Sequence, residues 1–161
     1  MVHPGTPDAL IFERVKKIGA VGLGFPVTSS TNWAPDHGAE RSRLHFSTDY
    51  GSSSWCARTN DMHQWIQVNF GGESRWVTEV HLQGRGRDCD QWVTAYKLQF
   101  SDDGIDWHHV NEHEVFSGTT GMNEIAVNKL HRPVKCRALR LCPTAWNNHI
   151  SLRWEVFYAD F

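Results

Sequence analysis

The chain has 161 residues, of which 40% are hydrophobic and 21% charged, a composition typical of one globular domain and not of a disordered segment. Its 16 basic and 18 acidic residues give a net charge of −2 with neutral histidine, which argues against a general nucleic-acid binder and against membrane binding by charge alone. No apolar run approaches the ~20 residues that a membrane span requires.

Residues 1–24 differ from the rest of the chain and are interpreted as an N-terminal lead-in that adds at most an edge element, before a domain over residues 25–161. The start, MVHPGTPDAL, lacks the basic and apolar stretches of a signal peptide. Three origins stay open: a protein that remains inside the cell, one exported by another route, or one cut from a longer chain.

From Val27 onward, apolar residues recur at every second position, which predicts β-strands. The longest run, at 150–158, alternates an apolar row with an outer row that contains Ser151, Arg153 and Glu155. We expect each strand to bury one face and to expose the other, as in an antiparallel sandwich. Since no long helical period interrupts the strands, the sequence predicts an all-β sandwich or jelly roll.

Turn residues separate these runs. Asp103–Gly104 follows one strand and precedes Trp107, which predicts a hairpin turn in which glycine supplies a positive φ. Three tryptophans, Trp65, Trp107 and Trp154, fall in or beside strands and are predicted to lie in the core.

Four loops hold most of the polar and aromatic residues that could bind a ligand, and a rigid sandwich commonly carries its binding site on such loops. The candidates in chain order are Trp33, Asp36 and His37; Asp49 and Trp55; Arg85, Arg87, Asp88 and Asp90; and Trp146, Asn147 and His149.

Two interpretations of these loop residues stay open. The charges from Arg85 to Asp90 could hold the hydroxyls of a sugar or the polar groups of a peptide, or they could pair with one another at the surface. Trp33 and Trp146 could stack on a ligand, or they could cap the end of the barrel.

Motifs for catalysis and zinc binding are missing. The sequence has no Gly-x-Ser-x-Gly, no His-Glu-x-x-His and no phosphate loop, so we expect no enzyme. The four cysteines form no Cys-x-x-Cys, which argues against zinc. Cys56 and Cys89 lie in two of the loops and could meet as a disulfide, and buried free thiols are the alternative.

Several linked motifs within residues 25–158 resemble the discoidin, or coagulation factor 5/8 C-type, domain family. One family pattern is matched by Ser54–Trp55, by Trp65–Ile66–Gln67–Val68–Asn69 and by the strand that ends at Gln83–Gly84. A second is matched by Pro143 and Leu152–Arg153–Trp154–Glu155.

Within the family, residues 82–97 and 143–153 are most similar to the N-terminal domains of the slime-mould discoidin lectins. Those lectins carry Gly-Arg-Gly-Asp where this chain has Gly84–Arg85–Gly86–Arg87–Asp88. One residue is inserted, so the Arg-Gly-Asp adhesion tripeptide of those lectins is broken here.

The resemblance implies an eight-stranded antiparallel jelly roll that binds ligands with the loops at one end. Members of the family bind galactose-type sugars, anionic phospholipids, collagen or other proteins. The collagen-receptor branch uses a Trp, an Asp and an Arg, which align with Trp33, Asp49 and Arg85. Some sugar-binding relatives hold a structural calcium ion, for which Asp49 and Glu155 are the candidates here. The cysteine pair that clasps many extracellular members is absent.

The leading hypothesis is a lectin-like module for galactose or N-acetylgalactosamine glycans in cell adhesion, acting outside the cell or at its surface. Trp33 would stack on the sugar, while Arg85 and Asp88 or Asp90 would hold hydroxyls, with Asn147 and His149 nearby. A module that docks collagen, a receptor or anionic phospholipid is the alternative. Because single shallow sugar sites bind weakly, we expect a homo-oligomer or a place in a longer chain.

Overall fold

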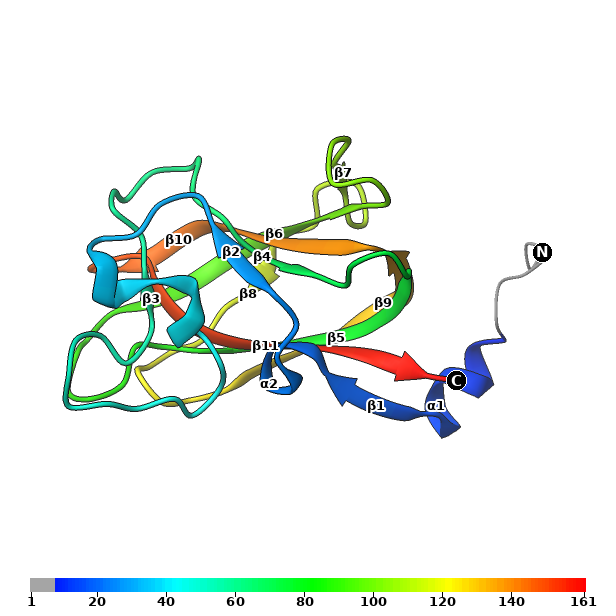
Figure 1. Ribbon diagram of the computed structural model, residues 1–161, viewed down its shortest axis with the longest axis horizontal. Coiled ribbons are helices and arrows are strands. Elements are labelled where there is room, and N and C mark those ends of the chain that lie inside the picture. The colour runs from blue at the N-terminus through cyan, green and yellow to red at the C-terminus, as the bar shows by residue number, and fades with distance from the viewer. Residues whose placement is uncertain (1–7) are drawn as a thin grey trace.

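Two antiparallel β-sheets pack face to face (Figure 1). This computed structural model describes residues 8–161, so residues 1–7 of the predicted lead-in lie outside the described residues. In the first sheet the strand order is β1-β11-β5-β9, and β3 pairs with β11. The bounds are β1 Lys16–Gly19, β3 Trp55–Cys56, β5 Arg75–Gln83, β9 Ala126–Cys136 and β11 Ser151–Asp160.

The second sheet has the order β2-β4-β10-β6-β7, and β8 pairs with β6. Its bounds are β2 Val27–Ser29, β4 Ile66–Asn69, β6 Trp92–Ser101, β7 His108–His109, β8 Phe116–Ser117 and β10 Ala138–Asn147. The predicted all-β sandwich is confirmed. Residues 8–161 form eleven strands where eight were expected, because short strands such as β3, β7 and β8 add to the long ones.

In the described residues 8–161, helical structure is confined to short segments, α1 Ala9–Arg14, α2 Ala20–Leu23 and the 3-10 turns η1 Pro35–His37 and η2 Ala39–Arg41. Within residues 8–161, no helix is both long enough and apolar enough to cross a membrane. Strand β1, from the lead-in, pairs with β11 at the edge of the first sheet.

The core lies between the sheets and is built from the apolar rows that the alternation predicted. Leu98 of β6 and Leu139 of β10 are fully buried, as are Leu82 of β5 and Trp154 and Val156 of β11. Complete burial of a large apolar side chain stabilises a fold by about 1.5–3 kcal/mol, so these rows fix how the two sheets face each other.

The outer row of β11 is also buried, which corrects the expectation that this strand exposes one face. Ser151, Arg153 and Glu155 are 0%, 3% and 7% exposed. The reason is that chain segments distant in sequence fold over the strand. The Arg153 side chain donates to the carbonyls of Phe46 and Met122, for example. Alternation along one strand carries no information about such covering segments.

Glu155 anchors α2 through backbone hydrogen bonds. Its Oε1 accepts the N–H of Val21 at 2.7 Å and of Val156 at 2.9 Å, and its Oε2 accepts the N–H of Gly22 at 2.8 Å. A Cβ at position 19 would lie 2.6 Å from Oε2, so Gly19 is needed for this close approach. A buried carboxylate is thus satisfied by backbone donors alone.

We predict that Glu155→Gln destabilises the fold by about 1–3 kcal/mol, because one accepting oxygen is replaced by an amide donor that faces a backbone N–H. Urea unfolding followed by tryptophan fluorescence measures the loss. Glu73→Gln is the matched control, since the Glu73 side chain is 75% exposed. Equal stability of the two variants would contradict this role for Glu155.

The three tryptophans predicted to lie in the core divide into two groups. Trp154 is fully buried, but Trp65 and Trp107 are only half-buried. Their rings lie 4.0 and 3.8 Å from the guanidinium carbon of Arg140, whose Nε and Nη2 donate to Gln67 Oε1. Desolvation lowers the pKa of Arg140. The two indoles therefore stack on a cation instead of joining the apolar core.

The turn at Asp103–Gly104 is confirmed. Gly104 has φ 77°, the left-handed region that glycine adopts without strain. Asp103 Oδ1 accepts the N–H groups of Ile105 and Asp106, both at 2.8 Å. These backbone donors lower the pKa of Asp103 to about 2, because they favour the ionised carboxylate.

Candidate functional site

Loops gather at the end of the sandwich that lies on the left in Figure 1, opposite the C-terminus. Residues from three of the four predicted loops line a pocket. This hollow of about 250 Å³, called the Arg85 pocket below, is lined by Trp33, His37, Arg85, Gln91 and His149. Four of these five residues were sequence candidates.

Trp33 presents an exposed indole held beside His149. Trp33 is 59% exposed. The centre of its ring lies 5.4 Å from the centre of the His149 ring, and the two ring planes make an angle of 88°. His149 is itself fixed, since Nε2 donates to the Ala57 carbonyl at 2.7 Å and Nδ1 accepts from the Asn60 amide at 3.1 Å. The contacts require the neutral imidazole, with its proton on Nε2.

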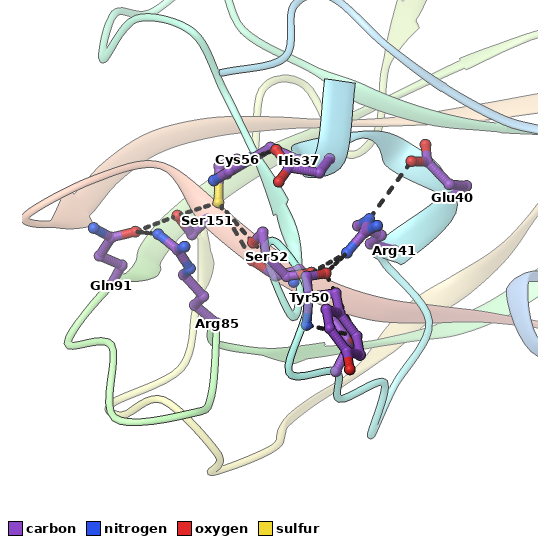
Figure 2. A network of polar contacts seen from close by, with 12 residues as sticks. His37, Glu40, Arg41, Tyr50, Ser52, Cys56, Arg85, Gln91 and Ser151 are labelled. Atoms are coloured by element: carbon purple, nitrogen blue, oxygen red, sulfur yellow. Dashed lines mark hydrogen bonds and ion pairs between the residues drawn. The ribbon is translucent and has the colours of Figure 1, made fainter. Parts of the chain in front are cut away.

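Arg85 is oriented by a chain of polar contacts that reaches into the protein interior (Figure 2). Its Nη1 donates to Gln91 Oε1 at 2.9 Å, and the same oxygen accepts from the Ser151 hydroxyl at 2.9 Å. The Ser151 Oγ lies 3.2 Å from the Cys56 sulfur. Within residues 8–161, Arg85 forms no ion pair, so its remaining N–H groups are available to a ligand.

The Cys56 thiol lies at the base of this chain. Its sulfur is 3.3 Å from the Ser52 hydroxyl and 3.6 Å from that of Ser54. Cys56 is buried and free, and Cys89 is half-buried and free. The alternative of a Cys56–Cys89 disulfide is therefore wrong for this structure, and the thiol packs as a small buried group among hydroxyls.

His37 enters the pocket from η1, which begins at Pro35. Its Nδ1 lies 2.6 Å from Asp36 Oδ1, so the carboxylate accepts from the imidazole. This hydrogen bond lowers the pKa of Asp36, and the positive charge of a protonated His37 acts in the same direction. Asp36 thus orients the ring of His37 at the pocket wall.

We predict that the carboxyl group of Asp36 titrates below its usual range and that His37→Ala moves the midpoint upward toward it. Because the folded pKa is lowered, the contact stabilises the fold above about pH 4 and is lost as the pH falls through the folded pKa. Carbon-detected NMR of the carboxyl shift during acid titration measures both midpoints. Identical midpoints in the two proteins would contradict the contact.

The loop that carries Arg85 has an unusual backbone. Gly86, Arg87 and Asp88 have φ values of 75°, 53° and 60°, all in the left-handed region. The first of these three residues must be glycine, because a Cβ at position 86 would lie 2.8 Å from the Nη2 of the buried Arg153. A hydrogen bond from the Arg85 N–H to the Gln91 carbonyl, at 3.0 Å, joins the two ends of the loop.

Several candidates lie outside the lining of the Arg85 pocket. Arg87 forms an exposed ion pair with Asp49, and Asp88 is exposed. The Asp90 carbonyl accepts the side-chain amides of Asn147 at 3.0 Å and Asn148 at 2.7 Å. Asp90 and Asn147 therefore tie the third loop to the fourth.

Two tryptophan candidates pack within the fold and do not line the pocket. Trp55 is fully buried, and its Nε1 donates to the Thr31 carbonyl at 2.9 Å, so the expectation that it contacts ligand is wrong. Trp55 belongs to β3, and the pairing of β3 with β11 holds the indole inside the sandwich. Trp146 is half-buried and packs against the core, and it does not line the pocket.

The two candidate calcium ligands do not fit a shared calcium site. The oxygens of Glu155 already accept three backbone N–H groups. Asp49 pairs with Arg87. Across the part of the chain that the structure describes, no group of three His, Cys, Asp or Glu residues is arranged to hold a metal.

Gln91 is the pocket residue that the candidate set missed, together with Ser151 and Cys56 beneath it. A signal for Gln91 was available, since it is a polar residue between the charged loop and the strand that begins at Trp92. For Ser151 and Cys56 no such signal existed, because their role depends on two strands that pair only in the fold.

Comparisons with known proteins agree with this architecture. The family model "F5/8 type C domain" matches residues 26–156. Discoidin-2 of Dictyostelium discoideum is 37% identical over 135 residues, which cover 80% of this chain and 52% of that protein. Lactadherin of Sus scrofa is 35% identical over 111 residues, which cover 65% of this chain and 27% of that protein. The chain thus spans about half the length of the discoidins it matches.

Solved structures give the same result. The structure of recombinant discoidin II of D. discoideum aligns with a TM-score of 0.86 and 32% identity, over 91% of this chain and 60% of that one. A family 32 carbohydrate-binding module from C. perfringens NanJ aligns with a TM-score of 0.65 at 12% identity, over 88% of this chain and 99% of that one. At that identity the second match shows the fold alone.

A two-sheet sandwich with a polar and aromatic pocket among its end loops is the architecture of a binding module. The chain belongs to the F5/8 type C, or discoidin, domain family. The resemblance noted in its motifs is therefore confirmed.

Proposed function

We propose that the chain is a lectin-like module that binds galactose or N-acetylgalactosamine glycans through the Arg85 pocket. The observation that carries the proposal is an exposed Trp33 indole beside an Arg85 guanidinium that has no carboxylate partner within residues 8–161. A galactose ring has one apolar face and several hydroxyls, so it matches an aromatic surface next to charged donors.

The relatives support this class of ligand. Discoidin II shares both sequence and fold with the chain. Three modules of the same fold were solved with sugars, one with galactose, one with GalNAc-β-1,3-galactose and one with chitotriose. We further propose that the module acts in adhesion, outside the cell or at its surface, on glycoproteins or other glycans.

We predict that Arg85→Ala weakens binding of N-acetylgalactosamine about 10- to 100-fold, because a hydrogen bond to a charged group contributes about 1.5–3 kcal/mol. A glycan array, read with calcium and again with chelator, identifies the ligand, and calorimetry measures the affinity. Arg132→Ala, at an exposed position on β9, is the matched control. We expect the array to give the same signal in chelator as in calcium, because Asp49 and Glu155 already have other partners.

A blank array with folded protein would contradict the glycan proposal. The next ligands to test would then be collagen or a receptor protein, and vesicles that contain phosphatidylserine. Binding to either of these, with no sugar bound, would replace the lectin function by a docking function.

We also predict that the natural protein presents several copies of the site, because a shallow pocket binds one free sugar weakly and linked copies raise the avidity. Size-exclusion chromatography with light scattering measures the number of subunits. A monomer whose natural chain held no second copy would contradict this expectation.

A further inference from the structure

A second pocket, of about 450 Å³, borders the loop that carries Arg85 through its neighbour Arg87. It is lined by His45, Ser47, Gln83, Arg87, Asn123 and Arg153 and is called the Arg153 pocket below. Residues 84–91 thus contribute Arg85 to one pocket and Arg87 to the other. None of the six lining residues is acidic.

The base of this pocket is a buried cation without an anionic partner. Arg153 is 3% exposed, and its guanidinium donates to the carbonyls of Gly84 at 2.7 Å, Phe46 at 3.0 Å and Met122 at 2.8 Å. Within residues 8–161 no carboxylate forms an ion pair with it. Asn123 Oδ1 accepts a further N–H at 3.0 Å, so neutral oxygens use four of the five N–H groups, while the positive charge has no counterion within residues 8–161.

The rim of the pocket carries unused donors. The Ser47 hydroxyl, the Asn123 side-chain N–H groups and the His45 ring have exposed positions, and none has a hydrogen-bond partner in the part of the chain that the structure describes. His45 also has φ 65°, a left-handed conformation that is held by its N–H donating to Gln83 Oε1 at 3.0 Å. Such strain outside glycine often marks a functional position.

Arg87 adds a second cation at the rim. It pairs with Asp49, but the two side chains are 53% and 73% exposed. An ion pair at this exposure contributes little stability, so a bound anion can replace Asp49 at low cost. The pocket therefore combines two guanidinium groups, neutral donors and one displaceable carboxylate.

We propose that the Arg153 pocket binds an oxyanion, either a sulfate ester or a carboxylate, on the same glycan whose neutral sugar occupies the Arg85 pocket. Oxyanions are the ligands that guanidinium groups and N–H or O–H donors select together. The glycan source follows from the shared loop, since residues 84–91 contribute a guanidinium group to each of the two pockets. This inference rests on the proposed lectin function and narrows its ligand to an acidic glycan.

The test compares N-acetylgalactosamine with its 4-sulfate and 6-sulfate, and galactose with galacturonic acid, by calorimetry at low ionic strength. We expect at least one acidic sugar to bind about tenfold more tightly than its neutral parent, and added salt to remove most of the difference. Arg87→Gln should abolish the gain and leave the neutral sugar unaffected. Asp49→Asn should increase the gain, because it removes the competing carboxylate. Arg132→Gln is the control and should change nothing.

The outcomes separate this inference from the function on which it rests. Equal affinity for neutral and acidic sugars would overturn the anion pocket and leave the lectin proposal standing. Failure of every sugar would overturn both. Amide shifts at His45, Ser47 and Asn123 on titration with sodium sulfate, absent in Arg87→Gln, support the pocket directly. Arg87-dependent binding to phosphatidylserine vesicles without a gain for acidic sugars would overturn the glycan assignment in favour of a lipid headgroup.

Discussion

The outer row of β11 holds the loop that carries Arg85 together with several segments around it. Ser151 holds Gln91 of the third loop, Arg153 holds the carbonyls of three separate segments, and Glu155 holds α2. These polar side chains alternate with the apolar ones that fill the core. One strand therefore joins the two sheets on its inner side and fixes the binding loops on its outer side.

Disulfides play no part in positioning these loops. All four cysteines are free, so the loops are held by buried hydrogen bonds instead of disulfides. A buried polar group stabilises a fold only when its partners are all in place, and each loss leaves an unsatisfied donor or acceptor. The loops are consequently positioned as one unit, and disturbance of Arg153 or Glu155 affects residues that neither side chain touches.

The alternation of apolar residues was sufficient to predict the sandwich, because inward rows such as Leu98 and Leu139 depend only on the period of a strand. Loop composition placed Trp33, His37, Arg85 and His149 among a larger set of candidates, since polar and aromatic residues gather where strands end. Two of the errors share one physical cause. Trp55 and the outer row of β11 are buried by segments far away in the sequence, and no local pattern reports which loop covers which strand.

The inserted residue in the third loop connects the two pockets. Relative to the slime-mould lectins, this chain reads Gly84–Arg85–Gly86–Arg87–Asp88, with one residue more than their Gly-Arg-Gly-Asp. The loop accommodates the longer sequence through three consecutive left-handed residues, a conformation unfavourable for Arg87 and Asp88. The same geometry separates Arg87 from Arg85, so the two guanidinium groups line different pockets. The change that breaks the adhesion tripeptide therefore also supplies the second cation, and the strain is explained if an anionic ligand compensates for it.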